Sequence, residues 1–191
     1  MSTETNIECI LQNIEGNMRL REGLIETPDR VARMYKEVFD GYQVEPSDFL
    51  KKTFSKEIEY KQKKAVNDGL VIVKDIDFFS HCEHHMVPFY GKVHVGYIPK
   101  NRVVGLSKIV RVVNGYAHRL QVQERLTEQV ANCIYDNLDC LGVVVVIEAV
   151  HLCMVMRGVK NSTASTTTSC IRGIYERSEK VLNEFYRLIG R

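Results

Sequence analysis

The stretch KVHVGYI, residues 92–98, decides the fold class, because its side chains alternate between two kinds. Val93, Val95 and Tyr97 are apolar, and the residues between them are polar or small. Successive side chains of a β-strand point to opposite faces of the sheet, so this period of two indicates a strand with one face in the core. The apolar run at 70–73 predicts a second strand, and we expect the two strands to pair antiparallel.

Further along the chain, the apolar period changes from two to that of a helix. Two apolar stripes predict two helices between Ser107 and Leu138: Ile109, Val110, Val113 and Ala117 in the first, and Leu126, Val130, Cys133, Ile134 and Leu138 in the second. After Gly142, β-branched residues predict a strand that continues to Met156, and residues 171–176 can pair with it across the Ser/Thr-rich loop 161–169. The order strand, strand, two helices, strand, strand predicts an α+β domain.

The N-terminal part of the chain is expected to be helical. Apolar residues recur at helical spacing over 4–15, and a second helix begins at Thr27-Pro28, with Thr27 as its N-cap. Arg30 and Arg33 share a face of this helix away from its apolar stripe, where they can meet an anion or simply be solvated. A lysine-rich connection follows at 51–64. We therefore expect one domain over 1–191, with a helical extension at 1–50 and the core at 65–191.

Composition excludes several classes of function. The formal charge of +2 over 191 residues is too small for general nucleic-acid binding. The longest apolar run, 141–149, contains Glu148 and is far shorter than the roughly 20 residues of a membrane span. The first 15 residues are acidic and polar, unlike a signal peptide, so we expect a cytoplasmic protein whose six cysteines are reduced.

Two short motifs predict a metal site. In Cys82-x-x-His85, two intervening residues let a turn bring both donor atoms to one metal, although unliganded loop residues are the alternative. His151-x-Cys153 lies in the predicted strand, where period two puts both side chains on one face, roughly 6–7 Å apart. Two thiolates and one imidazole suit Zn²⁺ and leave a fourth position open for water. His84 and His151 are candidate proton carriers, but the spacing leaves His84 open as a fourth ligand.

A second group of residues is suited to a polyanionic purine nucleotide. Ser107, Lys108 and Arg111 fall at the start of a predicted helix, where the free backbone N–H groups favour phosphate, and Arg157 follows the second motif. Next to Gln123, the carboxylate of Glu124 can accept two hydrogen bonds from a guanine edge, or it can simply complement a helix dipole. For His94 and His118 we expect solvent exposure or an ordinary hydrogen bond rather than catalysis.

Taken together, these residues resemble the GTP cyclohydrolase I family along nearly the whole chain. The matching segments are Arg21–Leu24, Thr27–Ala32, Cys82–His85, Gly105–Lys108, Gln121–Leu126 and Ala149–Cys153. The resemblance implies a tunnelling fold, with an antiparallel four-stranded sheet, two helices between its middle strands and additional N-terminal helices. It also implies a homodecamer of two pentamers with active sites at subunit interfaces, where Arg30 and Arg33 of a neighbouring chain contact phosphate.

The resemblance also implies a role for each site residue. Zn²⁺ is held by Cys82, His85 and Cys153, which leaves His84 as a non-ligand. His84, His151 and Ser107 are catalytic; Gln123 and Glu124 hold guanine; Ser107, Lys108, Arg111 and Arg157 hold the ribose and triphosphate. GTP is converted to 7,8-dihydroneopterin triphosphate with release of formate, as the first step of pterin or folate-type biosynthesis.

Three other functions fit parts of the pattern. A zinc nucleoside deaminase shares His81-x-Glu83, but the Pro-Cys-x-x-Cys half of its signature is absent. A nitrile reductase of the tunnelling fold would not need the three zinc ligands. A non-catalytic purine-nucleotide-binding regulatory protein would use zinc for stability alone, and such a structural site would be saturated by four protein ligands.

Overall fold

The computed structural model describes residues 1–55 and 69–191 of the chain. Residues 56–64 of the lysine-rich connection, and the expected start of the core at residue 65, lie outside this part. The chain divides into two compact units, 1–40 and 41–191. No helix in the described part is both long enough and apolar enough to cross a membrane.

The first unit is helical, as its apolar spacing predicted. It contains α1 (Thr3–Glu15), the 3-10 turn η1 (Glu22–Leu24) and α2 (Thr27–Val38). Ser2 caps α1, since its hydroxyl accepts a hydrogen bond from the Thr5 N–H at 3.2 Å. The expected N-cap of α2 was wrong by one residue: the cap position is Glu26, Thr27 is already helical, and its hydroxyl bonds back to the Gly23 carbonyl at 3.5 Å.

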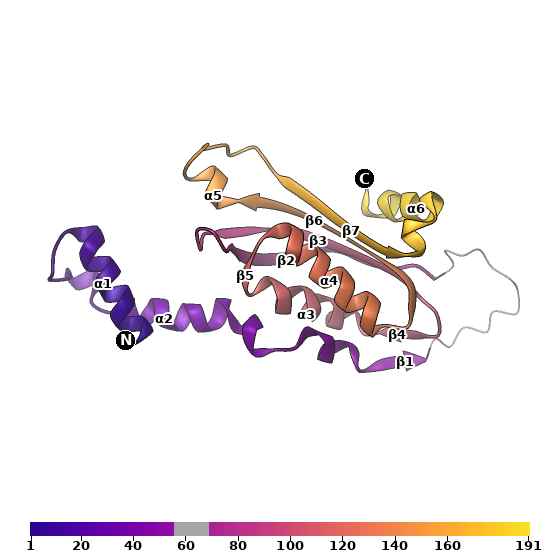
Figure 1. The fold of residues 1–191 in the computed structure, drawn as a ribbon, viewed down its shortest axis with the longest axis horizontal. Coiled ribbons are helices and arrows are strands. Elements are labelled where there is room, and N and C mark those ends of the chain that lie inside the picture. Colours follow the sequence, from indigo (N-terminus) through magenta and orange to yellow (C-terminus); the bar gives the residue numbers. More distant parts are fainter. Residues whose placement is uncertain (56–68) are drawn as a thin grey trace, which may run out of the picture. The chain divides into compact units, whose positions relative to one another are not determined.

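The second unit is an α+β domain (Figure 1). Its strands are β1 (Thr53–Ser55), β2 (Val71–Cys82), β3 (Pro88–Pro99), β4 (Arg102–Val104), β5 (Leu120–Gln121), β6 (Cys140–His151) and β7 (Thr166–Gly173). Its helices are α3 (Leu106–Ala117), α4 (Gln123–Asn137), α5 (Leu152–Val155) and α6 (Glu179–Ile189), with 3-10 turns η3 (Pro46–Leu50) and η4 (Ile174–Glu176). A further 3-10 turn, η2 (Asp40–Gln43), spans the division between the two units.

The main sheet has five strands, in the order β5-β2-β3-β6-β7, where the resemblance implied four. The four long strands are antiparallel as expected. The additional strand, β5, is only two residues long and lies between α3 and α4. It pairs parallel with the end of β2, with His81 opposite Leu120 and Cys82 opposite Gln121. Strands β1 and β4 form a separate two-stranded sheet.

Both faces of the sheet are covered. Val93, Val95 and Tyr97 of β3 belong to the larger core cluster, together with apolar residues of α3 and α4. The opposite face packs on α6, where Val144 and Phe185 share a smaller cluster (Figure 1). Because α6 occupies that face, the residues that alternate with the larger core are also buried, and His94 is only 4% exposed.

Candidate metal site and active site

The metal cluster is built on the turn that joins β2 to β3. Cys82 is the last residue of β2, and its carbonyl accepts hydrogen bonds from the N–H groups of His85 (3.3 Å) and Met86 (2.8 Å). Met86 takes a left-handed conformation, with φ of 54°, which reverses the chain so that the Val87 carbonyl accepts from the Cys82 N–H at 2.9 Å. This tight turn places His85 Nδ1 3.9 Å from Cys82 Sγ.

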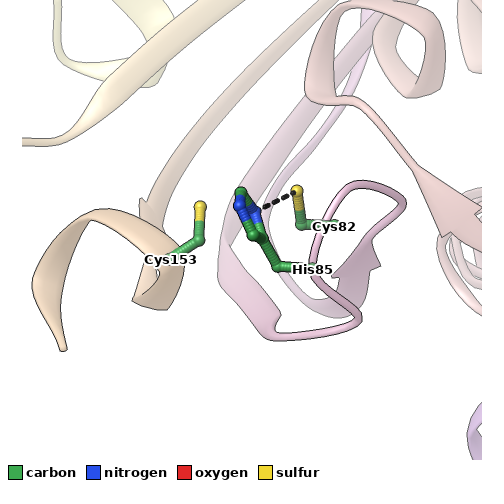
Figure 2. Close-up of side chains that lie close together, drawn as sticks. All are labelled: Cys82, His85 and Cys153. Carbon is green, nitrogen blue, oxygen red and sulfur yellow. Dashed lines mark hydrogen bonds between the residues drawn. The ribbon is translucent and has the colours of Figure 1, made fainter. Parts of the chain in front are cut away.

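The third member of the cluster comes from the end of β6. Because β3 pairs with both β2 and β6, the turn after β2 and the end of β6 meet at the same end of the sheet. Each of Cys82, His85 and Cys153 offers one donor atom, and these atoms lie within 4.8 Å of one another (Figure 2). The prediction that Cys153 lies in a strand was wrong: β6 ends at His151, and Cys153 lies in the short helix α5.

The donor set fits a soft divalent cation. Two sulfur atoms and one imidazole nitrogen are the donors that Zn²⁺ prefers, and three protein ligands leave one tetrahedral position open. Burial, together with the neighbouring Cys82 thiol, raises the pKa of Cys153, so the Cys153 thiol resists ionisation by itself. A cation between the sulfur atoms would offset that cost.

Two more predicted site residues border the cluster. His84 is exposed, and its Nδ1 lies 3.6 Å from Cys82 Sγ. Arg157 Nη1 donates to His85 Nε2 at 3.0 Å, which brings a guanidinium to the edge of the cluster. A titratable imidazole and a cation therefore lie beside the candidate metal position.

His151 is held in place from two sides. It stacks on Phe89, its partner across the β3–β6 pair, with ring centroids 4.7 Å apart and planes 3° from parallel. Its Nε2 lies 2.7 Å from Gln123 Oε1. Burial lowers the pKa of His151, and the nearby Glu124 carboxylate opposes that shift, so the neutral imidazole is favoured at neutral pH.

Gln123 is the first residue of α4, and its side chain is buried. Its amide nitrogen donates to the Ile147 carbonyl (3.0 Å), the Thr166 carbonyl (3.0 Å) and the Thr168 hydroxyl (3.1 Å). Glu124, one residue later, is exposed. The two residues that were predicted to hold guanine therefore differ sharply in what they can offer a ligand.

Apart from Arg157, the predicted phosphate-binding residues lie on the helices α3 and α2. Ser107, Lys108 and Arg111 occupy the first two turns of α3, with Ser107 and Arg111 exposed. Among the residues that the structure describes, no hydrogen bond connects them to the metal cluster. Arg30 and Arg33 are exposed on α2 of the first unit, and Arg30 pairs with Glu26 at 3.1 Å.

Sequence reasoning missed an ion pair that connects the metal turn to α4. Arg125 Nη2 pairs with Glu83, and Arg125 Nε donates to the Gln121 side chain at 3.0 Å. Gln121 also accepts the Glu83 N–H at its backbone carbonyl, at 3.0 Å. Glu83 and Arg125 are 42 residues apart, so no local pattern indicates the pair. Phe89 was missed for the same reason, since its contact with His151 depends on strand register.

The fold and the cluster define an α+β protein with a candidate three-ligand metal site beside a histidine held at the end of a strand. This chain belongs to the GTP cyclohydrolase I family, whose family model matches residues 3–190. It is 50% identical over 183 residues to the GTP cyclohydrolase 1 of Clostridium kluyveri, covering 96% of this chain and 91% of the relative.

Two further curated relatives carry the same name. The protein of Desulforamulus reducens is 52% identical over 187 residues, covering 97% of this chain and 95% of the relative. The protein of Carboxydothermus hydrogenoformans is 50% identical over 188 residues, covering 98% and 93%. Among solved structures, the apo archaeosine synthase QueF-Like aligns with 58% of this chain and 97% of its own, at 18% identity and a TM-score of 0.45.

Proposed function

We propose that this protein is a GTP cyclohydrolase I that converts GTP to 7,8-dihydroneopterin triphosphate and formate. The observation that carries the proposal is the gathering of Cys82, His85 and Cys153 within 4.8 Å, in a chain that belongs to this family over residues 3–190. His151, two residues before Cys153, supplies an oriented imidazole at the same end of the sheet. Relatives about 50% identical over nearly the full chain bear the corresponding name.

The proposed metal is Zn²⁺, held by the Sγ atoms of Cys82 and Cys153 and by the imidazole of His85. When bound, it supplies a Lewis acid that lowers the pKa of a coordinated water toward about 7. His84 is proposed to remain a non-ligand, which leaves it able to carry protons. An open coordination position is what a catalytic zinc site requires and a structural one lacks.

The chain's own residues handle protons and bind the substrate. His151 accepts a proton from the attacking water and passes it to N7 of the purine as the water oxygen adds to C8. The imidazole ring of GTP then opens to a formamide, and a second water hydrolyses this formamide to formate and a free amine. His84 and Ser107 assist the rearrangement of the ribose, after which the free amine closes the pterin ring. The carboxylate of Glu124 accepts from N1–H and the exocyclic amine of guanine, a pair of donors that adenine does not present.

The triphosphate is held by cations, and it is not cleaved. Lys108 and Arg111 on α3, together with Arg157 beside the cluster, are proposed to bind it, with the N-terminus of α3 adding its backbone N–H groups. Arg30 and Arg33 are proposed to reach the phosphates of a neighbouring subunit. Binding of the remote triphosphate orients the purine, so truncated nucleotides should lose rate as well as affinity.

We propose that the two units act as one domain in a homodecamer of two pentamers. The extension spans 1–50 and the core 65–191, and the family match runs across both. The four long antiparallel strands, with α3 and α4 between β3 and β6 in the chain, agree with a tunnelling fold that closes through its sheet edges. A cytoplasmic location agrees with six free thiols.

The test is to incubate zinc-loaded and chelator-treated protein with GTP and to follow formate together with the dihydropterin absorbance. We expect both products with metal and neither without it. His151→Ala should abolish product while zinc stays bound. If GTP binds but is never opened at any zinc loading, the protein is a zinc-stabilised nucleotide-binding protein and the proposed reaction is wrong.

A further inference from the structure

Both the amide nitrogen and the amide oxygen of the Gln123 side chain are hydrogen-bonded within the protein. It is 1% exposed, and its nitrogen and oxygen make four hydrogen bonds of 2.7–3.1 Å within the chain. Its two N–H groups already have three protein acceptors, so the amide nitrogen has no donor to spare for a bound base. The resemblance assigned this residue to the guanine edge, and its contacts indicate a different task.

The surroundings of Gln123 also determine which way round its amide lies. Two of the three groups around the nitrogen are the backbone carbonyls of Ile147 and Thr166, which can only accept hydrogen bonds. A flipped amide would place its oxygen against both carbonyl oxygens and leave them without that donor. The oxygen must therefore face His151, and the hydrogen bond that it makes there is donated by His151 Nε2.

That bond selects one tautomer of His151. A neutral imidazole carries one proton, and with Nε2–H donating to Gln123 the lone pair is on Nδ1. The stacked ring of Phe89 fixes the plane of the imidazole, at an interplanar angle of 3°. Gln123 and Phe89 together therefore leave Nδ1 as the ring atom that is free to exchange a proton.

We propose that Gln123 is a positioning residue for His151: it fixes the Nε2–H tautomer so that Nδ1 exchanges the proton with the substrate. Recognition of the guanine edge then falls to Glu124, the exposed neighbour. The inference rests on the proposed function for the role of His151 in the reaction. The hydrogen bond between Gln123 and His151 does not depend on that function, because it is present in the protein without substrate.

The kinetic test compares GTP with inosine triphosphate, which lacks the exocyclic amine, in two adjacent variants. Gln123→Met keeps an unbranched side chain of similar length but accepts no hydrogen bond from His151. We expect kcat to fall by at least about 10-fold and by the same factor for both nucleotides, and to fall by less than the roughly 10²–10⁴-fold that a general acid–base group contributes as a whole. KM should change little, because no contact to substrate is removed.

Glu124→Gln is the matched control, one residue along α4. It should reduce kcat/KM more for GTP than for inosine triphosphate, because only GTP presents the amine to the carboxylate. If Gln123→Met instead raises KM or changes the ratio between the two nucleotides, Gln123 touches the base and the proposal is wrong. Should Gln123→Met fail to fold, Thr168→Val can replace it, because it removes one hydrogen-bond acceptor of the Gln123 amide. It should lower kcat by a smaller factor that is again equal for the two nucleotides.

A spectroscopic test separates this proposal from the proposed function. In metal-free protein labelled with ¹⁵N-histidine, the solid-state spectrum distinguishes the two tautomers, and His151→Ala identifies the His151 signals. At a pH well above the ordinary imidazole pKa, we expect the Nε2–H form in the wild type and its loss in Gln123→Met. An Nδ1–H form in the wild type would overturn the positioning role. An Nε2–H form in a protein that releases no formate even when it is loaded with zinc would support the positioning role and contradict the proposed reaction instead.

Discussion

At the scale of single residues, His94 couples folding to pH. It is buried in the middle of β3, and its Nδ1 accepts the Asp75 N–H at 3.2 Å. Burial lowers the pKa of His94; the carboxylates of Asp75 and Glu148 oppose the shift, while Arg191 and Lys74 add to it. The folded state therefore binds fewer protons than the unfolded state near and below pH 6.5, so stability is lost as pH falls through the unfolded pKa of about 6.5.

We predict that His94→Gln reduces this sensitivity to acid. Glutamine can still accept the Asp75 N–H but does not titrate. On going from about pH 7.5 to 5.5, the melting temperature of the wild type should fall more than that of the variant, because only the wild type must keep a buried histidine neutral. Thermal melts of both proteins across this range make the comparison, and parallel curves would show that His94 contributes nothing to the pH dependence.

The cysteines give a second prediction at this scale. Cys82→Ser and Cys153→Ser each replace a soft thiolate donor by a hydroxyl that does not ionise at neutral pH, so zinc content should fall from about one per chain to near zero. Cys9→Ser is the matched control, because Cys9 is exposed on α1 and is not one of the three clustered donors. Metal analysis after dialysis gives the answer, and full zinc retention in Cys153→Ser would remove that residue from the ligand set.

At the scale of elements, the β3–β6 pair determines where the site residues lie. A Cβ at Gly91 would fall 1.9 Å from the Glu148 carbonyl oxygen, which is backbone and cannot move alone. Gly91 is paired with Ala149, two residues before His151 along β6. We predict that Gly91→Ala destabilises the protein by at least about 1–3 kcal/mol, as overpacking does, and also lowers activity by shifting His151 against Phe89.

The control for this substitution is Gly23→Ala, where none of the described residues comes within 4 Å of the added Cβ. Urea unfolding of both variants compares their stability, and formate release compares their activity. A Gly91→Ala protein as stable as Gly23→Ala would mean that the two strands separate easily at this point. In that case the register of the β3–β6 pair would not be what fixes the position of His151.

The sequence predicted the elements better than their ends. The run after Gly142 indicated a strand as far as Met156, but β6 ends at His151, because β3 begins at Pro88 and the chain before it turns away to form the metal loop. Beyond His151, the part of the chain that the structure describes has no neighbouring strand on that side. Strand β7 starts at Thr166, within the stretch expected to be a loop, because hydroxyl side chains were taken as turn residues although they pair with β6.

In the candidate site, contacts between residues close in sequence could be predicted, whereas contacts between distant residues could not. The Cys82 and His85 pair could be predicted because two ligands three residues apart need only a turn. The bonds of Gln123 could not, because its acceptors are backbone carbonyls 24 and 43 residues away, whose positions depend on strand register. A backbone acceptor carries no side-chain signal, so only the folded structure indicates that the Gln123 amide is already occupied.

At the scale of the whole molecule, the two units contribute differently to the proposed function. The core clusters are formed by residues of the second unit, and α1 buries none of its own. The second unit also holds the metal cluster, His151 and Glu124, whereas Arg30 and Arg33 belong to the first unit. If these arginines bind the phosphates of a neighbouring chain, the catalytic and phosphate-binding parts of one site come from two different copies.

Mixed oligomers test this arrangement. One chain carries Arg30→Gln and Arg33→Gln and keeps His151; the other carries His151→Ala and keeps both arginines. If the arginines serve their own chain, no combination contains a complete site, and a refolded equal mixture stays as inactive as its parents. If they serve a neighbour, random assortment completes roughly one quarter of the interfacial sites, and activity should reappear at about that fraction of wild type.

The outcome depends on subunit exchange, so the two chains must be refolded together and shown by differential tags to share oligomers. Mixing them after assembly is the control, because intact oligomers keep both defects separate. Recovery only after joint refolding requires a site shared between copies, since neither chain alone has all the parts. A shared oligomer without recovery would assign Arg30 and Arg33 to their own chain or to the solvent, and the proposed interfacial site would then have to be built without them.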